Sequence, residues 1–218
     1  MKRMIGKFIT VEGIEGVGKT TNLNFIRDYL LSEGKEVVVT REPGGTLLGE
    51  NIRELLLGHK HDGMADDTEL LMMFSARAEH LDKVIKPNIQ AGRWVLCDRF
   101  TDATYAYQGG GRGIDLERIA QLEQWVQSDL RPDVTFLLDA PVELALDRAG
   151  KRSAPDRFEK EQHAFFERVR AVYHQLAKKQ PQRYIVIDTS ADLVTVQNNL
   201  LMRLKKYLKE DLKEDLSA

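Results

Sequence analysis

Residues 13–20 read Gly13-Ile14-Glu15-Gly16-Val17-Gly18-Lys19-Thr20, which fits the phosphate-binding pattern G-x-x-x-x-G-K-[ST]. An apolar run over 8–11 precedes this loop, and helical periodicity begins at Thr20. A strand, a glycine-rich loop and a helix N-terminus in this order direct backbone N–H groups and the helix dipole toward a bound phosphate. We expect Lys19 to reach the β- and γ-phosphates and the Thr20 hydroxyl to ligate Mg²⁺. The loop therefore predicts a nucleoside triphosphate site rather than an incidental glycine turn.

The composition indicates one compact domain over residues 1–218. Lys and Arg number 32 against 34 Asp and Glu, a formal net charge of −2, which favours neither nucleic acid nor a membrane as a partner. The one cysteine, Cys97, lies in an apolar run, which indicates a buried thiol and a reducing compartment. The first strand begins almost at the N-terminus and no run of about 18 apolar residues occurs. We therefore expect a cytoplasmic protein without a signal peptide or a membrane span.

Short apolar runs rich in β-branched residues recur along the chain, at 8–11, 37–40, 94–97, 134–138 and 184–187. They are continuously apolar rather than alternating, as in parallel strands covered on both faces. Stretches with helical spacing, such as 67–89, lie between them. This alternation predicts an α/β fold with a five-stranded parallel sheet and helices on both faces. Ligands in such folds bind outside the carboxyl ends of the strands.

Charged residues follow these runs on the edge where a ligand would bind. Asp98 comes directly after the third run, as expected for the acid that holds Mg²⁺, and Arg99 can present two donors to a phosphate. The alternative is a surface ion pair. Arg41, Arg53 and Arg77 can return to the same edge. A second phosphate-bearing molecule would need such cations, although any one of them could instead lie on a solvated helix face.

Three further segments carry glycine or proline beside polar groups. Residues 43–46 read Pro-Gly-Gly-Thr and predict a tight turn. Residues 105–113 contain two tyrosines and Gln108, followed by a glycine run that we expect to be flexible. Aromatic rings and an amide beside such a run suit the binding of a flat heterocycle. The alternative is a mobile loop whose tyrosines pack on the core. Residues 148–157 carry four cations with Gly150 and Pro155, and predict either a loop that closes over phosphates or an ordinary polar connection.

These segments, in this order, closely resemble the bacterial thymidylate kinase family, whose members phosphorylate dTMP with ATP. The resemblance runs over essentially the whole chain. It is carried by residues 12–21, the Thr-Arg-Glu-Pro-Gly-Gly-Thr of 40–46, Arg77, the Asp-Arg of 98–99 and residues 106–113. It implies a P-loop kinase fold with a short lid at about 148–158, ATP as co-substrate with Mg²⁺, dTDP and ADP as products, a role in dTTP synthesis, and a homodimer.

The resemblance also implies where ATP and the metal bind. ATP is expected on the phosphate loop, whose residues are Gly13, Ile14, Glu15, Gly16, Val17, Gly18, Lys19, Thr20 and Thr21, with Arg148 near the adenine. Thr20 and Asp98 match the metal-binding positions. Glu15 matches the loop acid that faces the sugar hydroxyl of the acceptor.

On the acceptor side, Arg99 matches the arginine that holds the acceptor phosphate, and Glu42 and Arg53 match positions near that phosphate and the metal. The base is expected beside Arg77, which hydrogen-bonds the thymine edge, and beside Thr104 and Gln108. The family usually stacks thymine on a phenylalanine four residues before this arginine. Met73 occupies that position here and Phe74 comes next, so either Met73 covers the base or the helix shifts locally.

The catalytic cation is expected outside the phosphate loop. Some thymidylate kinases carry an arginine directly after the loop acid, but that position is Gly16 here. Other members place the arginine in the lid, where Arg152 is our candidate, with Lys151 and Arg157 as neighbours. Such a cation stabilises the charge that spreads over the transferring phosphoryl group. We therefore expect Lys19, Arg99 and Arg152 to be the catalytic residues. Ala103 replaces a small hydroxyl residue common in the family, which removes one polar contact.

The sequence bears on three other functions. A kinase for dUMP or a related monophosphate differs only by the thymine methyl group, which is worth about 1–3 kcal/mol in a fitted pocket. A GTPase switch would need a guanine-reading Asn-Lys-x-Asp, which this sequence does not contain. An inactive binding module would not need Lys19, Thr20, Asp98 and Arg99 together.

Overall fold

The computed structural model describes residues 6–58, 60, 63–150, 157–158 and 161–217. Its centre is a sheet of five parallel strands in the order β2-β3-β1-β4-β5. The strands are β1 (Phe8–Glu12), β2 (Val37–Arg41), β3 (Trp94–Asp98), β4 (Val134–Asp139) and β5 (Tyr184–Asp188). The predicted parallel α/β sheet is therefore confirmed, and each strand extends one residue past its apolar run, to a charged side chain.

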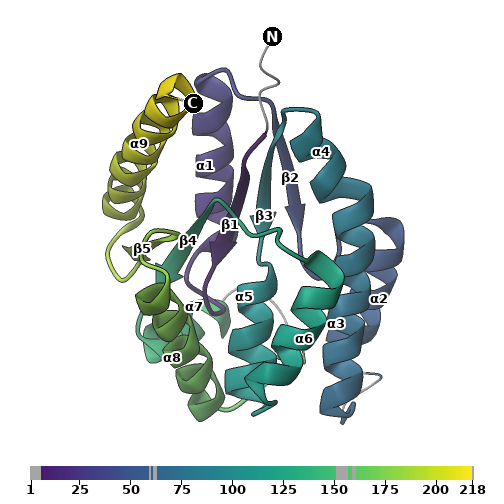
Figure 1. Cartoon of the computed structure of the whole chain (residues 1–218). Coiled ribbons are helices and arrows are strands. Elements are labelled where there is room, and N and C mark those ends of the chain that lie inside the picture. The colour runs from purple at the N-terminus through teal and green to yellow at the C-terminus, as the bar shows by residue number, and fades with distance from the viewer. Residues whose placement is uncertain (1–5, 59, 61–62, 151–156, 159–160, 218) are drawn as a thin grey trace.

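The register brings these charged strand ends to one edge of the sheet. Val11 of β1 and Arg41 of β2 both lie opposite Asp98 of β3. Asp139 and Asp188 lie opposite each other on β4 and β5. Figure 1 shows the carboxyl ends of the strands pointing the same way, away from the end of the molecule where N and C are marked. The segments that follow the strands therefore meet at this edge.

Helices cover both faces of the sheet (Figure 1). They are α1 (Lys19–Ser32), α2 (Leu47–Leu57), α3 (Asp66–His80), α4 (Lys86–Gln90), α5 (Thr101–Thr104), α6 (Leu116–Gln127), α7 (Val142–Gly150), α8 (His163–Lys179) and α9 (Leu193–Ser217), with π-helical segments η2 (Leu81–Ile85) and η3 (Tyr105–Gly111). Among the described residues, no helix is both long and apolar enough to cross a membrane.

Alternate side chains of the strands are buried on opposite faces, as the pleat requires. Phe8 packs in a cluster with Leu81 and Ile85 of η2, whereas Ile9 packs in a cluster with Leu23 and other residues of α1. The central strands β1, β3 and β4 are buried almost throughout, while the edge strands β2 and β5 are only partly buried. This arrangement explains why the central runs lack polar alternation.

The expected flexibility of the glycine run at 109–111 is wrong, because these residues form the end of the helical segment η3. A side-chain carbon added at Gly111 would lie 2.4 Å from the ring of Phe165 on α8, and one at Gly109 would lie 2.5 Å from Leu116. The glycines therefore allow close helix packing rather than loop motion. This packing outweighs the low helix propensity of glycine.

Candidate active site

The phosphate loop joins β1 to α1 in the predicted geometry. Gly18 has a left-handed backbone (φ 87°) and caps α1, which begins at Lys19. The Lys19 ammonium donates to the carbonyl oxygens of Gly13 (3.1 Å) and Ile14 (2.8 Å). Burial, followed by the nearby charge of Arg99, lowers the pKa of Lys19 to about 8. An anion bound at the loop would oppose both effects, because it favours the charged ammonium.

Residue 16 of this loop has no room for a side chain. Gly16 has a φ of 76°, and a side-chain carbon added there would lie 1.7 Å from the carbonyl oxygen of Ala145 in α7. The loop therefore packs directly on α7 at this point. An arginine after the loop acid would require the backbone of α7 to move.

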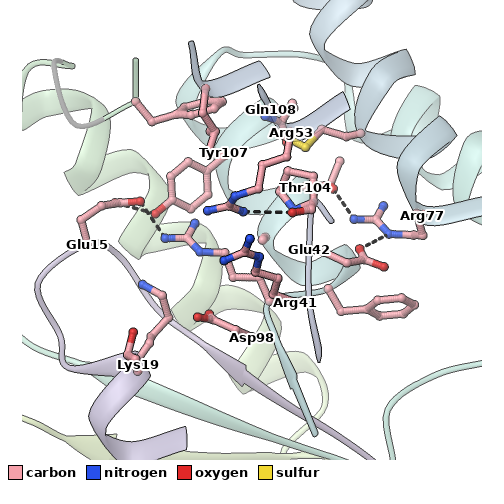
Figure 2. Close-up of a pocket in the computed structure, with 18 of the residues that line it drawn as sticks. Glu15, Lys19, Arg41, Glu42, Arg53, Arg77, Asp98, Thr104, Tyr107 and Gln108 are labelled. Carbon is pink, nitrogen blue, oxygen red and sulfur yellow. Dashed lines mark hydrogen bonds and ion pairs between the residues drawn. The ribbon is translucent and has the colours of Figure 1, made fainter. Parts of the chain in front are cut away.

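A cavity of about 310 Å³ opens beside the loop. Figure 2 shows Glu15 and Lys19 at one end of it and Arg77 at the other, with Arg41 and Arg53 between them. The predicted site residues that line this cavity are Glu15, Gly16, Lys19, Thr20, Glu42, Arg53, Met73, Arg77, Asp98, Arg99, Thr104 and Gln108. The segments that follow β1 and β2, the end of β3, and the helical segments α1, α2, α3, α5 and η3 thus meet at the carboxyl edge of the sheet, as predicted.

Arg99 and Glu15 form an ion pair at the loop end of the cavity. The Arg99 guanidinium donates to Glu15 at 2.6 Å, and the Tyr107 hydroxyl donates to the other Glu15 oxygen at 2.6 Å. Burial opposes the charge of Glu15, but Arg99 and Lys19 outweigh it and lower the pKa of Glu15. Arg99 has a left-handed backbone (φ 67°). This conformation is uncommon for a residue with a side chain and clusters at functional sites.

The far end of the cavity carries polar groups and a thioether. Met73 lines the cavity, whereas Phe74 is 2% exposed and packs in a core cluster with Leu70. The structure thus places Met73, and not Phe74, at the position that a base could reach. Thr104 accepts a hydrogen bond from Arg77 (2.9 Å), and the Gln108 amide donates to the buried Glu69.

Two cations and one carboxylate line the middle of the cavity. Arg53 donates to the carbonyl oxygen of Pro43 at 2.9 Å, and the exposed Arg41 pairs with Glu50 at 2.7 Å. The Oδ1 atom of Asp98 is buried and has no hydrogen-bond partner among the described residues. A buried carboxylate oxygen without a donor fits a cation, because leaving such an atom unpaired is costly.

A second hollow, of about 460 Å³, lies on the other side of the phosphate loop. Its lining comes from the phosphate loop and α1, from α7, and from the start of α9 and the residues just before it: Gly16, Val17, Gly18, Thr21, Asn22, Arg148, Thr189, Ala191, Asp192, Leu193 and Val196. Arg148 donates to the carbonyl oxygens of Thr189 (2.7 Å) and Ser190 (3.2 Å), which holds its side chain along this hollow. The predicted ATP-binding residues Val17, Gly18, Thr21 and Arg148 are thus brought together.

The predicted lid falls largely outside the described residues. The candidate catalytic Arg152 and its neighbour Lys151 lie in this undescribed part. Arg157 is described and is buried: its guanidinium donates to the carbonyl oxygen of Leu56 (2.8 Å) and pairs with Glu69. Arg157 is therefore held in an ion pair with α3 and does not line the cavity beside the phosphate loop.

The cavity is also lined by Arg41, Ala103 and Tyr107, which the sequence had indicated near the acceptor. Positions 104, 107 and 108 share one helix face, which brings Tyr107 beside Thr104 and Gln108. Four further lining residues were not predicted, namely Pro43, Leu57, Phe100 and Phe158. Glu12 is a further buried group: it accepts from the Phe100 backbone N–H (2.7 Å) and the Tyr173 hydroxyl (2.8 Å). Burial, followed by the charge of Asp102, raises the pKa of Glu12 to about 8.

A protein that only binds a nucleoside triphosphate needs one hollow beside its phosphate loop. In the part of the chain that the structure describes, two hollows meet at Gly16 of the loop. The hollow away from Arg148 is lined by Arg53 and Arg99, and also by the polar side chains of Thr104 and Gln108. A parallel five-stranded sheet with this arrangement defines the class of P-loop nucleoside-monophosphate kinases.

Comparison with known proteins gives the family within this class. The family model of thymidylate kinase matches residues 11–200. The chain is 55% identical over 205 residues to a thymidylate kinase of Pseudomonas syringae pv. tomato, covering 94% of this chain and 98% of that relative. It is 58% identical over 194 residues to a thymidylate kinase of Pseudomonas entomophila, covering 89% and 92%. The crystal structure of thymidylate kinase from Ehrlichia chaffeensis matches with a TM-score of 0.75 and 40% identity, over 92% of this chain and 98% of that one. The chain belongs to the thymidylate kinase family.

Proposed function

We infer that this chain transfers the γ-phosphoryl group of ATP to dTMP, giving dTDP and ADP. Membership of the thymidylate kinase family supports this reaction. The structural observation that carries it is the pair of hollows that meet at Gly16 of the phosphate loop. Two nucleotides bound in these hollows would bring their phosphates together at the loop, which converts a bimolecular reaction into one between positioned groups.

We propose that dTMP occupies the cavity lined by Arg53, Met73 and Arg77. Its phosphate would lie near Arg99 and Arg53, because these cations line the cavity close to the phosphate loop. Its base would lie at the far end, where the Nη1 atom of Arg77 is buried without a hydrogen-bond partner among the described residues. Thymine presents a carbonyl oxygen at its edge, which such a donor can bind. Met73 would cover one face of the ring.

ATP would occupy the second hollow, with its phosphates on the loop and its base near Arg148. Lys19 would turn from the carbonyl oxygens of Gly13 and Ile14 to the phosphates. No side-chain general base is required, since the acceptor is already a phosphate oxyanion. We propose Arg152, from the lid, as the cation that stabilises the transferring group. The packing of Gly16 on Ala145 supports this proposal, because the loop itself cannot supply an arginine at that position.

The residues at the loop fit a magnesium ion. Asp98 has an unpartnered buried oxygen, and the exposed Thr20 hydroxyl lines the same cavity. Among the described residues no group of three or more His, Cys, Asp or Glu side chains could hold a metal, so most other ligands would come from ATP and water. We propose that Thr20 and Asp98 hold Mg²⁺, which when bound would neutralise charge on the phosphates.

A coupled assay of ADP release across dTMP, dUMP, dCMP, dAMP and dGMP tests the proposed function. We expect dTMP to give the highest kcat/KM, and dUMP to follow within about 10–100-fold because it lacks one methyl group. Equal rates with the purine monophosphates would exclude the assignment. Lys19→Ala should abolish turnover while the far-UV spectrum stays unchanged. The homodimer and the cytoplasmic location stay predictions, and light scattering on the purified chain would measure the first.

A further inference from the structure

The carboxylate of Glu42 is held from two sides. Its Oε2 atom accepts from the Nε of Arg77 at 2.7 Å, and its Oε1 atom accepts from the Nδ1 of His80 at 2.9 Å. Arg77 and His80 are three residues apart on α3, so both side chains leave the same face of the helix. All three residues are at most 5% exposed. Because a carboxylate only accepts hydrogen bonds, both nitrogens carry protons in this arrangement.

This contact fixes the guanidinium of Arg77 in the cavity (Figure 2). Besides Glu42, the guanidinium donates from Nη2 to Thr104. It also lies over the rings of Phe74 (4.7 Å) and Phe100 (5.2 Å). Nη1 alone is left without a partner among the described residues. The direction of this remaining donor depends on the carboxylate that holds Nε.

His80 is itself anchored to the sheet. Its Nε2 atom lies 2.6 Å from the hydroxyl of Thr40 on β2. The turn after β2 packs over this contact: a side-chain carbon at Gly45 would lie 2.5 Å from both the His80 ring and the Thr40 hydroxyl. The ring is fully buried and does not line the cavity. It therefore links β2 to Glu42 without touching the substrate space.

We propose that His80 is a positioning residue for base recognition: by holding Glu42 between itself and Arg77, it directs the one unpartnered donor of Arg77 at the thymine edge. The inference rests on the proposed function, since it assigns the base to the Arg77 end of the cavity. If His80 only filled space in the core, its replacement would change stability and leave the affinity for the acceptor alone.

Two amide substitutions separate these roles. In His80→Asn the side-chain amide nitrogen takes nearly the position of the histidine Nδ1, so it can still donate to Glu42. In His80→Gln the amide nitrogen takes nearly the position of the histidine Nε2, so it faces Thr40 instead of Glu42. We expect H80N to keep the KM for dTMP within about twofold and H80Q to raise it about tenfold, the effect of weakening a hydrogen bond to a charged group. The KM for ATP should stay unchanged in both. Selectivity for dTMP over dCMP should fall in H80Q, because cytosine presents an amino group where thymine presents an oxygen.

Thr10→Val is the matched control. It removes one buried hydrogen bond, between the hydroxyls of Thr10 and Thr135, away from the cavity. We expect it to lower the melting temperature without changing either KM. The NMR signal of the Arg77 Nε–H is measured without substrate and is assigned by its loss in R77K. We expect this signal to be sharp in the wild type and in H80N, and broadened in H80Q.

Equal KM values for dTMP and equal Nε–H signals in H80N and H80Q would overturn the positioning role. A wild type that phosphorylates other monophosphates but not dTMP would instead refute the proposed function. The Nε–H signals of the two variants would still decide whether His80 positions Arg77.

Discussion

Replacing Glu12 by Gln tests the energetic effect of a buried carboxyl group beside the phosphate loop. Glu12 is fully buried, accepts from the Phe100 backbone N–H and the Tyr173 hydroxyl, and has a pKa raised to about 8 by burial and then by Asp102. A glutamine keeps an oxygen for Phe100 and presents an amide donor to Tyr173. It removes only the group that can ionise.

The magnitude follows from the pKa in the two states. The carboxyl binds its proton more tightly in the native state, with a pKa of about 8, than in the unfolded chain, where the ordinary value is 4.5. Its contribution to stability is therefore complete below pH 4.5 and is lost as the pH rises toward 8. At about 1.4 kcal/mol per pH unit, the full loss is about 5 kcal/mol, of which about 4 kcal/mol falls between pH 5 and pH 8.

Urea unfolding followed by circular dichroism at pH 5, 6, 7 and 8 would measure this effect. We expect the unfolding free energy of E12Q minus that of the wild type to increase steadily over this range. Thr10→Val, which changes no titratable group, should differ from the wild type by the same amount at every pH. A difference for E12Q that is flat, or that shrinks as the pH rises, would show that Glu12 is ionised in the native protein at neutral pH.

Three further sets of substitutions have defined outcomes. Asp98→Asn should raise the Mg²⁺ concentration for half-maximal activity about tenfold or more, since a charged ligand is lost; an unchanged magnesium titration would exclude Asp98 as a ligand. Met73→Ala should raise the KM for dTMP a few-fold and leave the KM for ATP unchanged. Phe74→Ala should instead lower the unfolding free energy by about 3–5 kcal/mol. A raised KM for dTMP in the Phe74 variant, with no change in the Met73 variant, would place Phe74 on the base. Gly111→Ala should destabilise the protein by about 1–3 kcal/mol, because its added methyl group meets a buried ring. Gly150→Ala, where no atom of the described residues lies within 4 Å, is the control in the same thermal melt, and equal melting temperatures of the two variants would contradict the packing argument.

The sheet could be predicted from the sequence because its signals are local. Each strand is an apolar run of four or five residues that ends at a charge, and the parallel register then brings those charges to one edge. The helical segment η3 could not be predicted in this way. Glycines 109–111 are poor helix formers, and only their contact with Phe165, far along the chain, explains why a helix forms there.

The residues of the candidate site that the sequence indicated are likewise those with local signals. Lys19 and Asp98 stand in recognisable motifs, and the structure brings them to one cavity. His80 and Glu12 carry no such signal: a histidine on a helix or a glutamate at a strand end does not indicate its tertiary partners. Arg157 illustrates the opposite case, since its place in a basic segment suggested phosphate contact, whereas the fold pairs it with Glu69.

The buried Nη1 atom of Arg77 sets a chemical requirement for competitive inhibitors of this protein. This atom is already shielded from water in the folded protein, so an acceptor placed opposite it would gain a hydrogen bond to a charged group, about 1.5–3 kcal/mol, without removing water from the protein. A compound that fills the Arg77 end of the cavity without such an acceptor would therefore bind about 10–150-fold more weakly than one that carries it. Fragment libraries for this cavity should carry a carbonyl or ring-nitrogen acceptor on one edge and a flat surface for the Met73 sulfur.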